Sequence, residues 1–236
     1  MHAKPVFAAS TLSAVLNRRM AAGGDVRLWA ALRPVIKRLM DFVGAVILLL
    51  CAAPVFLLVA VAVSVDGGPV FFTHHRVGRG GREFGCLKFR SMYTDAGRRL
   101  AELLEQDPAA RVEWITRRKL RRDTRITPLG RLLRLSSVDE LPQLLNVLAG
   151  QMSFVGPRPV VREELEKFYS PANAVGEYLS VRPGITGPWQ VSGRSDADYD
   201  KRIALDVAYV REPSLRNDLS ILASTVVSVL QRRGAC

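Results

Sequence analysis

Cysteine is scarce in this chain, and its few cysteines are not paired. The 236 residues include three, Cys51, Cys86 and Cys236, which are widely spaced and form no C-x-x-C motif. An odd, scattered set of this kind indicates neither a disulfide framework nor a zinc site. His74 and His75 do not read as a metal pair either, because adjacent residues on a strand point to opposite faces. We therefore expect a reduced domain that faces the cytosol.

Nucleic-acid signatures are also lacking, although the chain is basic. Lysine and arginine number 34 against 22 aspartates and glutamates, which gives a net charge of +12. This excess predicts polyanionic partners: phosphate-bearing substrates, anionic lipid surfaces or nucleic acid. The arginine-rich run 121–125 has no interleaved aromatic residues, and no nucleic-acid motif is recognisable. We therefore expect no nucleic-acid partner.

Charge is absent from one long run, Phe42 to Val65. As a straight helix this run would be about 36 Å long, against a hydrocarbon core of about 30 Å, so we expect it to enter a membrane. A simple crossing is the default interpretation. However, Pro54 lies in the middle of the run, and basic residues flank both ends, which the positive-inside tendency places on the cytosolic side. The flanking residues are Arg33, Lys37, Arg38, Arg76, Arg79 and Arg82.

A helix bent at Pro54 that enters and leaves by the same face satisfies both observations, provided that packing or side chains cover the freed backbone carbonyl. Re-entrant and spanning helices both stay open. With 48% hydrophobic residues, the length suits one domain plus a membrane segment. We expect an accessory segment over residues 1–34, a membrane-inserted helix over 35–66, and a cytosolic domain carrying the chemistry over 67–236. The first segment resembles a signal peptide poorly, so we expect it to stay attached, and its Gly23-Gly24 pair to interrupt any long helix.

The cytosolic part begins with a predicted β-hairpin. Extended runs at Pro69–His75 and Glu83–Arg90 are joined by a glycine-rich turn. Lys88 and Arg90 share one face of the second strand, where phosphate binding and a solvated edge are equally good interpretations. Further on, residues 97–120, interrupted by a proline, and residues 218–230 are apolar on one side. We expect these to form amphipathic helices, lying in the headgroup layer or packed on the core.

The stretch 136–159 carries two adjacent acids. After Asp139 and Glu140, leucines recur at i, i+3, i+4 and i+7, which predicts a helix with a buried apolar face. Pro142 fits best at the first helical position, with the acids just ahead of it. Alternatively, Ser137 caps the helix and Glu140 completes a capping box, although Pro142 would then meet a backbone carbonyl. Either register places the acids near the positive end of the helix dipole, so we expect both to be ionised.

Phosphate chemistry follows from the two ends of this stretch. Neighbouring carboxylates repel unless a cation lies between them, and oxygen ligands together with phosphate substrates indicate Mg²⁺. At the far end, Pro157 and Pro159 fix the loop and leave the Arg158 guanidinium as a fork for phosphate or carboxylate. Helix capping alone is the competing explanation for the acids.

The motifs LSSVDELPQLLNVLAGQMSFVGPRP and VRPGITGPWQVSGR resemble the bacterial sugar transferase family, the monotopic polyprenyl-phosphate phosphoglycosyl transferases, in their short form. The resemblance runs from about Val35 to Leu230. It implies an α+β, helix-rich, membrane-associated domain with a small β-hairpin and a re-entrant helix. It also implies transfer of a sugar 1-phosphate from a UDP-sugar to undecaprenyl phosphate, with UMP released through an aspartyl phosphosugar intermediate and with Mg²⁺ as cofactor. This would be the first membrane step of glycan assembly (exopolysaccharide, O-antigen, capsule or glycoprotein), at the cytosolic face of the bacterial inner membrane.

By this resemblance Asp139 is the nucleophile and a Mg²⁺ ligand, and Glu140 holds Mg²⁺ beside it. Phosphate or nucleotide binding falls to Arg158, Lys88, Arg90, Arg182 and Arg194. The chain departs from the family pattern at four positions: Ala53 replaces a serine before Pro54, Val138 a leucine, Gln151 an aspartate, and Pro188 a leucine or tryptophan.

Two other functions remain open. A membrane-anchored basic protein could hold anionic lipid or nucleic acid without catalysis, through salt-sensitive contacts. A metal-dependent phosphatase would use water as the final acceptor and release inorganic phosphate. The sequence indicates neither the sugar nor the oligomeric state.

Overall fold

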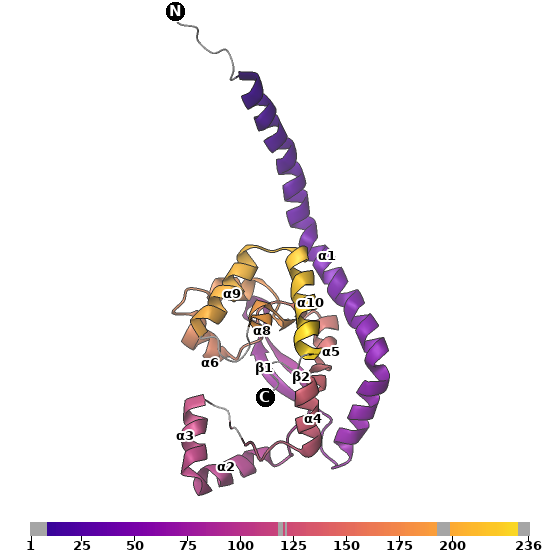
Figure 1. The fold of residues 1–236 in the computed structure, drawn as a ribbon, viewed down its shortest axis with the longest axis vertical. Helices are drawn as coiled ribbons and strands as arrows, with labels where there is room; N and C mark the ends of the chain where they lie inside the picture. Colours follow the sequence, from indigo (N-terminus) through magenta and orange to yellow (C-terminus); the bar gives the residue numbers. More distant parts are fainter. Residues whose placement is uncertain (1–8, 118–119, 121, 193–198, 231–236) are drawn as a thin grey trace, which may run out of the picture. The chain divides into compact units, whose positions relative to one another are not determined.

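The computed structural model describes residues 9–117, 120, 122–192 and 199–230 (Figure 1). The chain divides into two compact units, Met1–Met40 and Asp41–Cys236. Helix α1 (Ala9–Ser64) begins in the first unit and runs through Gly23 and Gly24 without a break. The expectation that these glycines interrupt a helix is therefore wrong. Two glycines cost about 2 kcal/mol of helix propensity relative to alanine, which a helix of this length can absorb.

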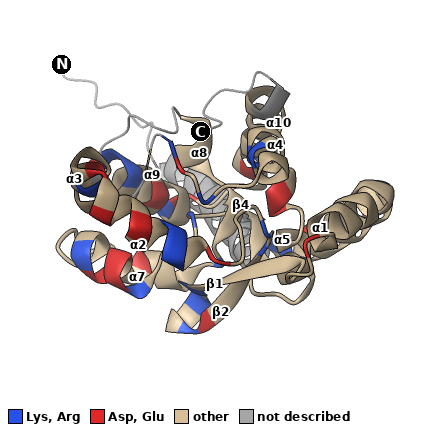
Figure 2. Ribbon diagram, turned by 90° about the horizontal axis from the view of Figure 1, so that it is seen from below, with Lys and Arg blue, Asp and Glu red and all other residues tan. Residues whose placement is uncertain are grey.

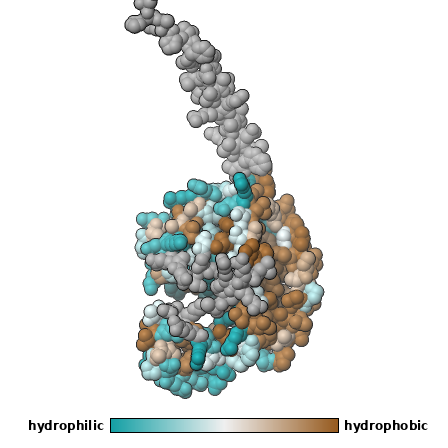
Figure 3. Space-filling model, in the orientation of Figure 1, coloured by the Kyte–Doolittle hydropathy of each residue, from teal (hydrophilic) through white to brown (hydrophobic). Residues whose placement is uncertain are grey.

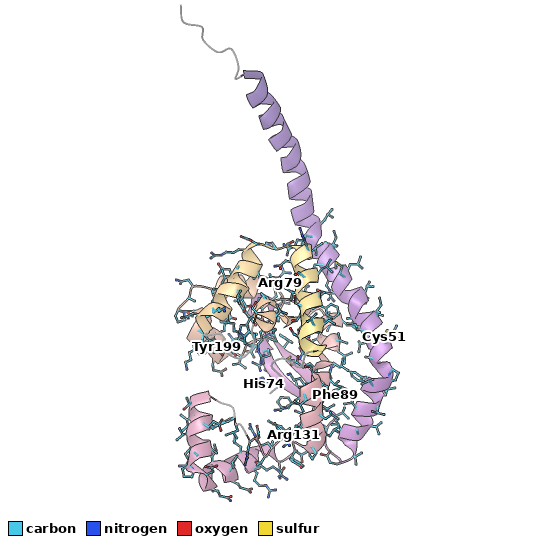
Figure 4. All side chains as sticks on the ribbon, viewed as in Figure 1. Cys51, His74, Arg79, Phe89, Arg131 and Tyr199 are labelled. Carbon is cyan, nitrogen blue, oxygen red and sulfur yellow. The ribbon has the colours of Figure 1, made fainter. Side chains whose placement is uncertain are left out.

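The part of α1 inside the second unit is apolar and curved. Most of it is tan in Figure 2, and its side of the molecule is brown in Figure 3. Beyond Cys51, labelled in Figure 4, the helix turns back toward helix α4 (Pro128–Ser136), and Val59 and Val63 pack against Leu133 there. A curve of this kind fits Pro54, because proline removes one backbone hydrogen bond and crowds the preceding turn. α1 nevertheless stays α-helical across this residue.

Ala31–Ser64 is, within the described ranges, the one helix long and apolar enough to cross a membrane. Only 11% of its most apolar stretch is buried. Leu50 and Leu58 are each 71% exposed, although a soluble helix would hide such side chains. Length and composition thus allow membrane insertion, and the choice between re-entrant and spanning stays a prediction.

The hairpin is confirmed. Strand β1 (Phe71–Val77) pairs antiparallel with β2 (Glu83–Phe89), with Phe72 opposite Lys88 and Arg76 opposite Phe84. The 3₁₀ turn η1 (Arg79–Gly81) joins the strands, with Gly80 and Gly81 at positive φ, as a tight glycine turn requires. A second sheet, missed from sequence, pairs β3 (Ser153–Val155) parallel with β4 (Gly184–Thr186).

The predicted helices around the central stretch are confirmed. The two helices expected in residues 97–120 are α2 (Ala96–Gln106) and α3 (Pro108–Arg117), separated at Asp107. The acids lie in the 3₁₀ turn η2 (Val138–Glu140), and α5 (Gln143–Leu148) follows Pro142 directly. Pro142 thus stands at the start of the helix, and the capping box is wrong. Ser137 has φ 58°, and its side chain makes no cap hydrogen bond.

The remaining helices close the core on the other side of the hairpin. They are α6 (Arg162–Glu164), the π-helical turn η3 (Leu165–Tyr169), α7 (Val175–Ser180), α8 (Pro188–Val191), α9 (Tyr199–Arg211) and α10 (Leu215–Leu230). Buried Tyr178 ties them to β1, because its hydroxyl donates to the carbonyl of Val77 at 2.9 Å and accepts from the amide of Val160 at 3.1 Å. The helix-rich α+β fold with a small hairpin is confirmed.

Candidate active site

The acid pair lies where the chain reverses between α4 and α5. Ser137, in the left-handed region, ends α4 and directs the next residues toward the hairpin. Asp139 is 7% exposed, whereas Glu140 is partly exposed. From β2, the Lys88 ammonium lies 2.6 Å from a Glu140 carboxylate oxygen and 3.8 Å from one of Asp139. The structure thus brings together three of the residues named from sequence.

Burial raises the pKa of Asp139 above its ordinary value. Lys88 and Arg134 lower this pKa and Glu140 raises it further. Attack on phosphorus requires the ionised carboxylate, so positive charge beside Asp139 favours the reactive form.

The two carboxylates fit Mg²⁺ as ligands. Both are hard oxygen donors, and Mg²⁺ commonly takes one or two protein carboxylates and completes its shell with water and substrate phosphate. Among the described residues no group of three or more His, Cys, Asp or Glu could hold a metal alone. Asp139 and Glu140 would hold such a cation, and the phosphates of a substrate would complete its coordination.

Arg90 lies elsewhere and is saturated by internal contacts. Its Nε donates to the carbonyl of Pro69 at 2.7 Å, and its Nη2 to that of Val63 at 2.8 Å. Both terminal nitrogens also bind Asp66. The Arg90 hydrogen bond lowers the pKa of Asp66 to about 2. These contacts tie the end of α1 to β2, and phosphate binding by Arg90 stays a prediction.

Arg158 is exposed on a rigid loop. A Cβ added to Gly156 would lie 2.5 Å from the carbonyl of Arg182, so the loop packs backbone to backbone against β4. The guanidinium of Arg158 lies over the Trp189 ring, 5.5 Å from its centroid. Within the described ranges no carboxylate forms an ion pair with it. An exposed fork of this kind is free to take a phosphate.

The other two predicted arginines differ in what the structure says of them. Arg182 donates through Nε to the carbonyl of Gly150 at 2.7 Å, which fixes the turn after α5. Its role at a diphosphate stays a prediction. Arg194 lies outside the described residues.

Sequence reasoning missed Asn146, which braces the acid segment against β2. Its side-chain amide accepts from the amide of Leu87 at 3.0 Å and donates to the carbonyl of Gly85 at 2.8 Å, as a neighbouring strand would. It also donates to the Gln151 side chain at 2.6 Å. Gln151 therefore supplies an acceptor where the family pattern has aspartate. No sequence pattern predicts a side-chain amide that bonds to a strand as a neighbouring strand would. The Leu87–Asn146 contact joins residues that are 59 positions apart.

Sequence reasoning also missed an arginine–acid cluster beside the Arg158 loop. Glu164 accepts from buried Arg202 at 3.0 Å and from the hydroxyl of Tyr199 at 3.0 Å. The Arg202 guanidinium lies 4.7 Å from the centroid of Trp189, on whose ring Arg158 also lies. Arg76 approaches the same glutamate, 4.0 Å from its second oxygen.

Comparison with known proteins agrees with these motifs. The Bacterial sugar transferase family matches residues 32–232. The chain is 49% identical over 200 residues to an undecaprenyl-phosphate galactose phosphotransferase of Salmonella typhimurium, a match that covers 85% of this chain and 41% of that protein. It is 41% identical to a UDP-glucose:undecaprenyl-phosphate glucose-1-phosphate transferase of Xanthomonas campestris pv. campestris, over 85% of this chain and 40% of that protein. The chain thus spans about two fifths of the length of these two relatives.

A relative of similar length also matches. The exopolysaccharide production protein ExoY of Sinorhizobium fredii is 47% identical over 209 residues, which are 87% of this chain and 91% of ExoY. The family match covers the hydrophobic helix, the acid pair and the arginine loop together. On these grounds the chain belongs to the bacterial sugar transferase family.

Proposed function

We propose that this protein moves a sugar 1-phosphate from a UDP-sugar to undecaprenyl phosphate and releases UMP. The observation that carries the proposal is the buried Asp139, with a lysine 3.8 Å away and a second carboxylate beside it. Family relatives named as undecaprenyl-phosphate sugar phosphotransferases support the same reaction.

In the first step, a carboxylate oxygen of Asp139 attacks the phosphorus that carries the sugar. The bond from this phosphorus to the bridging oxygen breaks, and its electron pair leaves with UMP. Lys88 balances charge on the acids, and Arg158 orients a phosphate. Bound at Asp139 and Glu140, Mg²⁺ would supply neutralising charge for the transferring group.

In the second step, an oxygen of undecaprenyl phosphate attacks the phosphosugar held on Asp139. The acyl-phosphate bond breaks, and Asp139 leaves as a carboxylate. Partial burial of Asp139 protects the acyl phosphate from water, which separates a transferase from a phosphatase.

The apolar helix supports a site at the membrane. In this proposal α1 enters the inner membrane from the cytosolic side, bends at Pro54 and returns to the same side, so that the acid pair meets lipid phosphate at the headgroup layer. Labelling of single cysteines placed at residues 38 and 82, in a variant without the native cysteines, tests the topology. Both should react only from the cytosol, and labelling from opposite sides would show a spanning helix.

Intact mass measurement tests the reaction. Purified protein is incubated with Mg²⁺ and a panel of UDP-sugars without lipid acceptor. We expect a sugar-phosphate adduct that is absent in Asp139→Asn and is discharged by undecaprenyl phosphate. If no sugar gives an adduct and no UMP appears when lipid phosphate is added, the proposal fails. Release of inorganic phosphate instead would indicate a phosphatase, and salt-sensitive lipid binding without turnover a basic membrane-anchored protein.

A further inference from the structure

Arg76 lies on the same face of the hairpin as Lys88. In an antiparallel pair, opposite residues project on one face, and alternate residues return to it. The register pairs Phe72 with Lys88, His74 with Cys86, and Arg76 with Phe84. One face of the hairpin therefore carries Lys88 at the acid pair and Arg76 further along, with Cys86 between them.

Charges of both signs act on Cys86, which lies between Lys88 and Arg76 on this face. Burial raises the pKa of this thiol, while the charges of Lys88, Arg76 and Arg158 lower it. The Glu140 charge acts on the same thiol and raises its pKa. Geometry links the Arg158 loop to the same end of the hairpin: Arg76 approaches Glu164, Glu164 binds Arg202, and Arg202 and Arg158 both lie against the Trp189 ring.

Among the described residues, Glu164 is the acid that forms an ion pair with Arg76, and no carboxylate forms one with Arg158. Arg76 is partly buried, and its ion pair with Glu164 is long, at 4.0 Å. The other oxygen of Glu164 already serves Arg202 and Tyr199, each at 3.0 Å. Burial lowers the pKa of Arg76, and the like charge of Arg158 lowers it further. Two guanidiniums at the Glu164–Arg202–Trp189 cluster, with one long ion pair to a described carboxylate, favour a bound anion.

We propose that Arg76, together with Arg158, binds the phosphate of the leaving nucleotide. The inference rests on the proposed function and adds a residue to it. Lys88 lies at the acids, where the sugar-bearing phosphorus must be attacked. Phe84, the residue opposite Arg76, lies four residues before Lys88 on β2, a distance of about 13 Å along the backbone. The long side chains of Arg76 and Lys88 can shorten this distance. The nucleotide phosphate of the donor, which is joined to the sugar-bearing phosphate, would then lie between Lys88 and Arg76.

The chemistry gives this position a function in the first step only. When the bridging bond breaks, its electron pair stays on the oxygen of the nucleotide phosphate. The charge on that phosphate rises from about −1 to −2, as a diester becomes a monoester. A guanidinium fork beside it stabilises this developing charge, so Arg76 acts as a catalytic residue for UMP departure. The second step involves no nucleotide, so Arg76 contributes nothing there.

The test separates the two steps. Arg76→Gln and Arg76→Lys are compared with Arg82→Gln, an exposed arginine beyond the turn of the same hairpin. For Arg76→Gln we expect adduct formation to slow about 100-fold, the loss typical of removing one charge-stabilising donor. UMP inhibition should weaken about 10-fold, and discharge of accumulated adduct to undecaprenyl phosphate should stay within about twofold of wild type. Arg76→Lys should recover part of the loss, and Arg82→Gln should match wild type.

The outcomes distinguish this inference from the proposed function. If Arg76→Gln forms adduct as fast as Arg82→Gln, the inference is overturned while the transferase stands. If adduct formation and discharge slow equally, together with a fall in thermal midpoint, Arg76 is only a structural partner of Glu164. If wild-type protein neither binds UMP nor releases it, both proposals fail.

Discussion

The two ends of the hairpin face differ in how far their cations are paired with acceptors within the protein. At one end, Lys88 lies between two carboxylates, and Arg90 nearby is saturated by Asp66 and two carbonyls. At the other end, Arg76 has one long ion pair with Glu164, which is already bound to other groups, and no described carboxylate forms an ion pair with Arg158. Cationic side chains that are paired within the protein have a fixed arrangement. Cationic side chains with few internal partners keep hydrogen-bond donors for a ligand. Burial alone therefore does not identify a ligand-binding arginine, and the supply of internal partners does.

Removing Lys88 should have the largest effect on adduct formation, because Lys88 pairs with both carboxylates at its end of the hairpin. Lys88→Met leaves two adjacent carboxylates with no ammonium, so the pKa of Asp139, already raised by burial, rises further. We expect adduct formation to fall about 100-fold at neutral pH. The acidic limb of its pH profile should move to higher pH, because a higher pKa keeps the carboxyl protonated further up the scale. Lys88→Arg keeps the charge and should keep the limb in place, and an unmoved limb in Lys88→Met would contradict this assignment.

Arg90 distinguishes a structural from a phosphate-binding arginine. Arg90→Met leaves the carbonyls of Val63 and Pro69 without their donor and should lower the free energy of unfolding by about 3 kcal/mol. Thermal unfolding in detergent measures this change. Asp66→Asn, which leaves Arg90 in place, should lower the thermal midpoint less than Arg90→Met does and should leave UMP inhibition unchanged. A large change in UMP inhibition with an unchanged midpoint in Arg90→Lys would instead support the phosphate role.

The Asn146 brace should have a moderate effect. Asn146→Ala removes two contacts to β2, so Lys88 and the acids lose their common support. We expect about a 10-fold fall in the rate of adduct formation with little change in donor KM. Asn146→Asp retains the oxygen that accepts from the Leu87 amide, so its rate of adduct formation should lie between those of wild type and Asn146→Ala. Exposed Asn217→Ala serves as the control, and equal rates in the two alanine variants would show that the brace is dispensable.

Gln151 should matter least. Its side-chain oxygen accepts from Asn146, and an aspartate at this position offers the same kind of acceptor. Gln151→Asp should therefore leave adduct formation within about twofold of wild type. A larger change would mean that the family's acid acts on the metal rather than on Asn146.

Periodic and local features could be predicted from the sequence. The hairpin, the two helices around Pro108 and the helix after Pro142 follow from alternation, helical spacing and proline placement. The ion pair of Lys88 with Glu140 was not predicted, because the family resemblance assigns Lys88 to phosphate binding. Local chemistry alone treated Lys88 as equally suited to a solvated edge.

Features that depend on distant pairing could not be predicted. β3 and β4 are three residues each, too short to show alternation, and pair only because Gly156 and Gly184 permit close backbone contact. Arg90 and Lys88 look equivalent on an isolated strand. Their difference arises from Asp66, which follows the hydrophobic helix and reaches β2 only in the folded chain.

The hydrophobic helix is fastened at both ends to the strands that carry the site. Asp41, 5% exposed, accepts from the amide of Phe154 on β3 at 3.0 Å, and Arg90 ties the carbonyl of Val63 to β2. A Cβ on Gly44 would lie 2.8 Å from the Phe154 ring, so the helix also fits closely against β3 near its Asp41 contact. Such a helix cannot slide along its axis without pulling on both strands. In the proposed membrane-inserted arrangement, bilayer thickness and lateral tension would be transmitted mechanically through these contacts to the segment that carries Asp139.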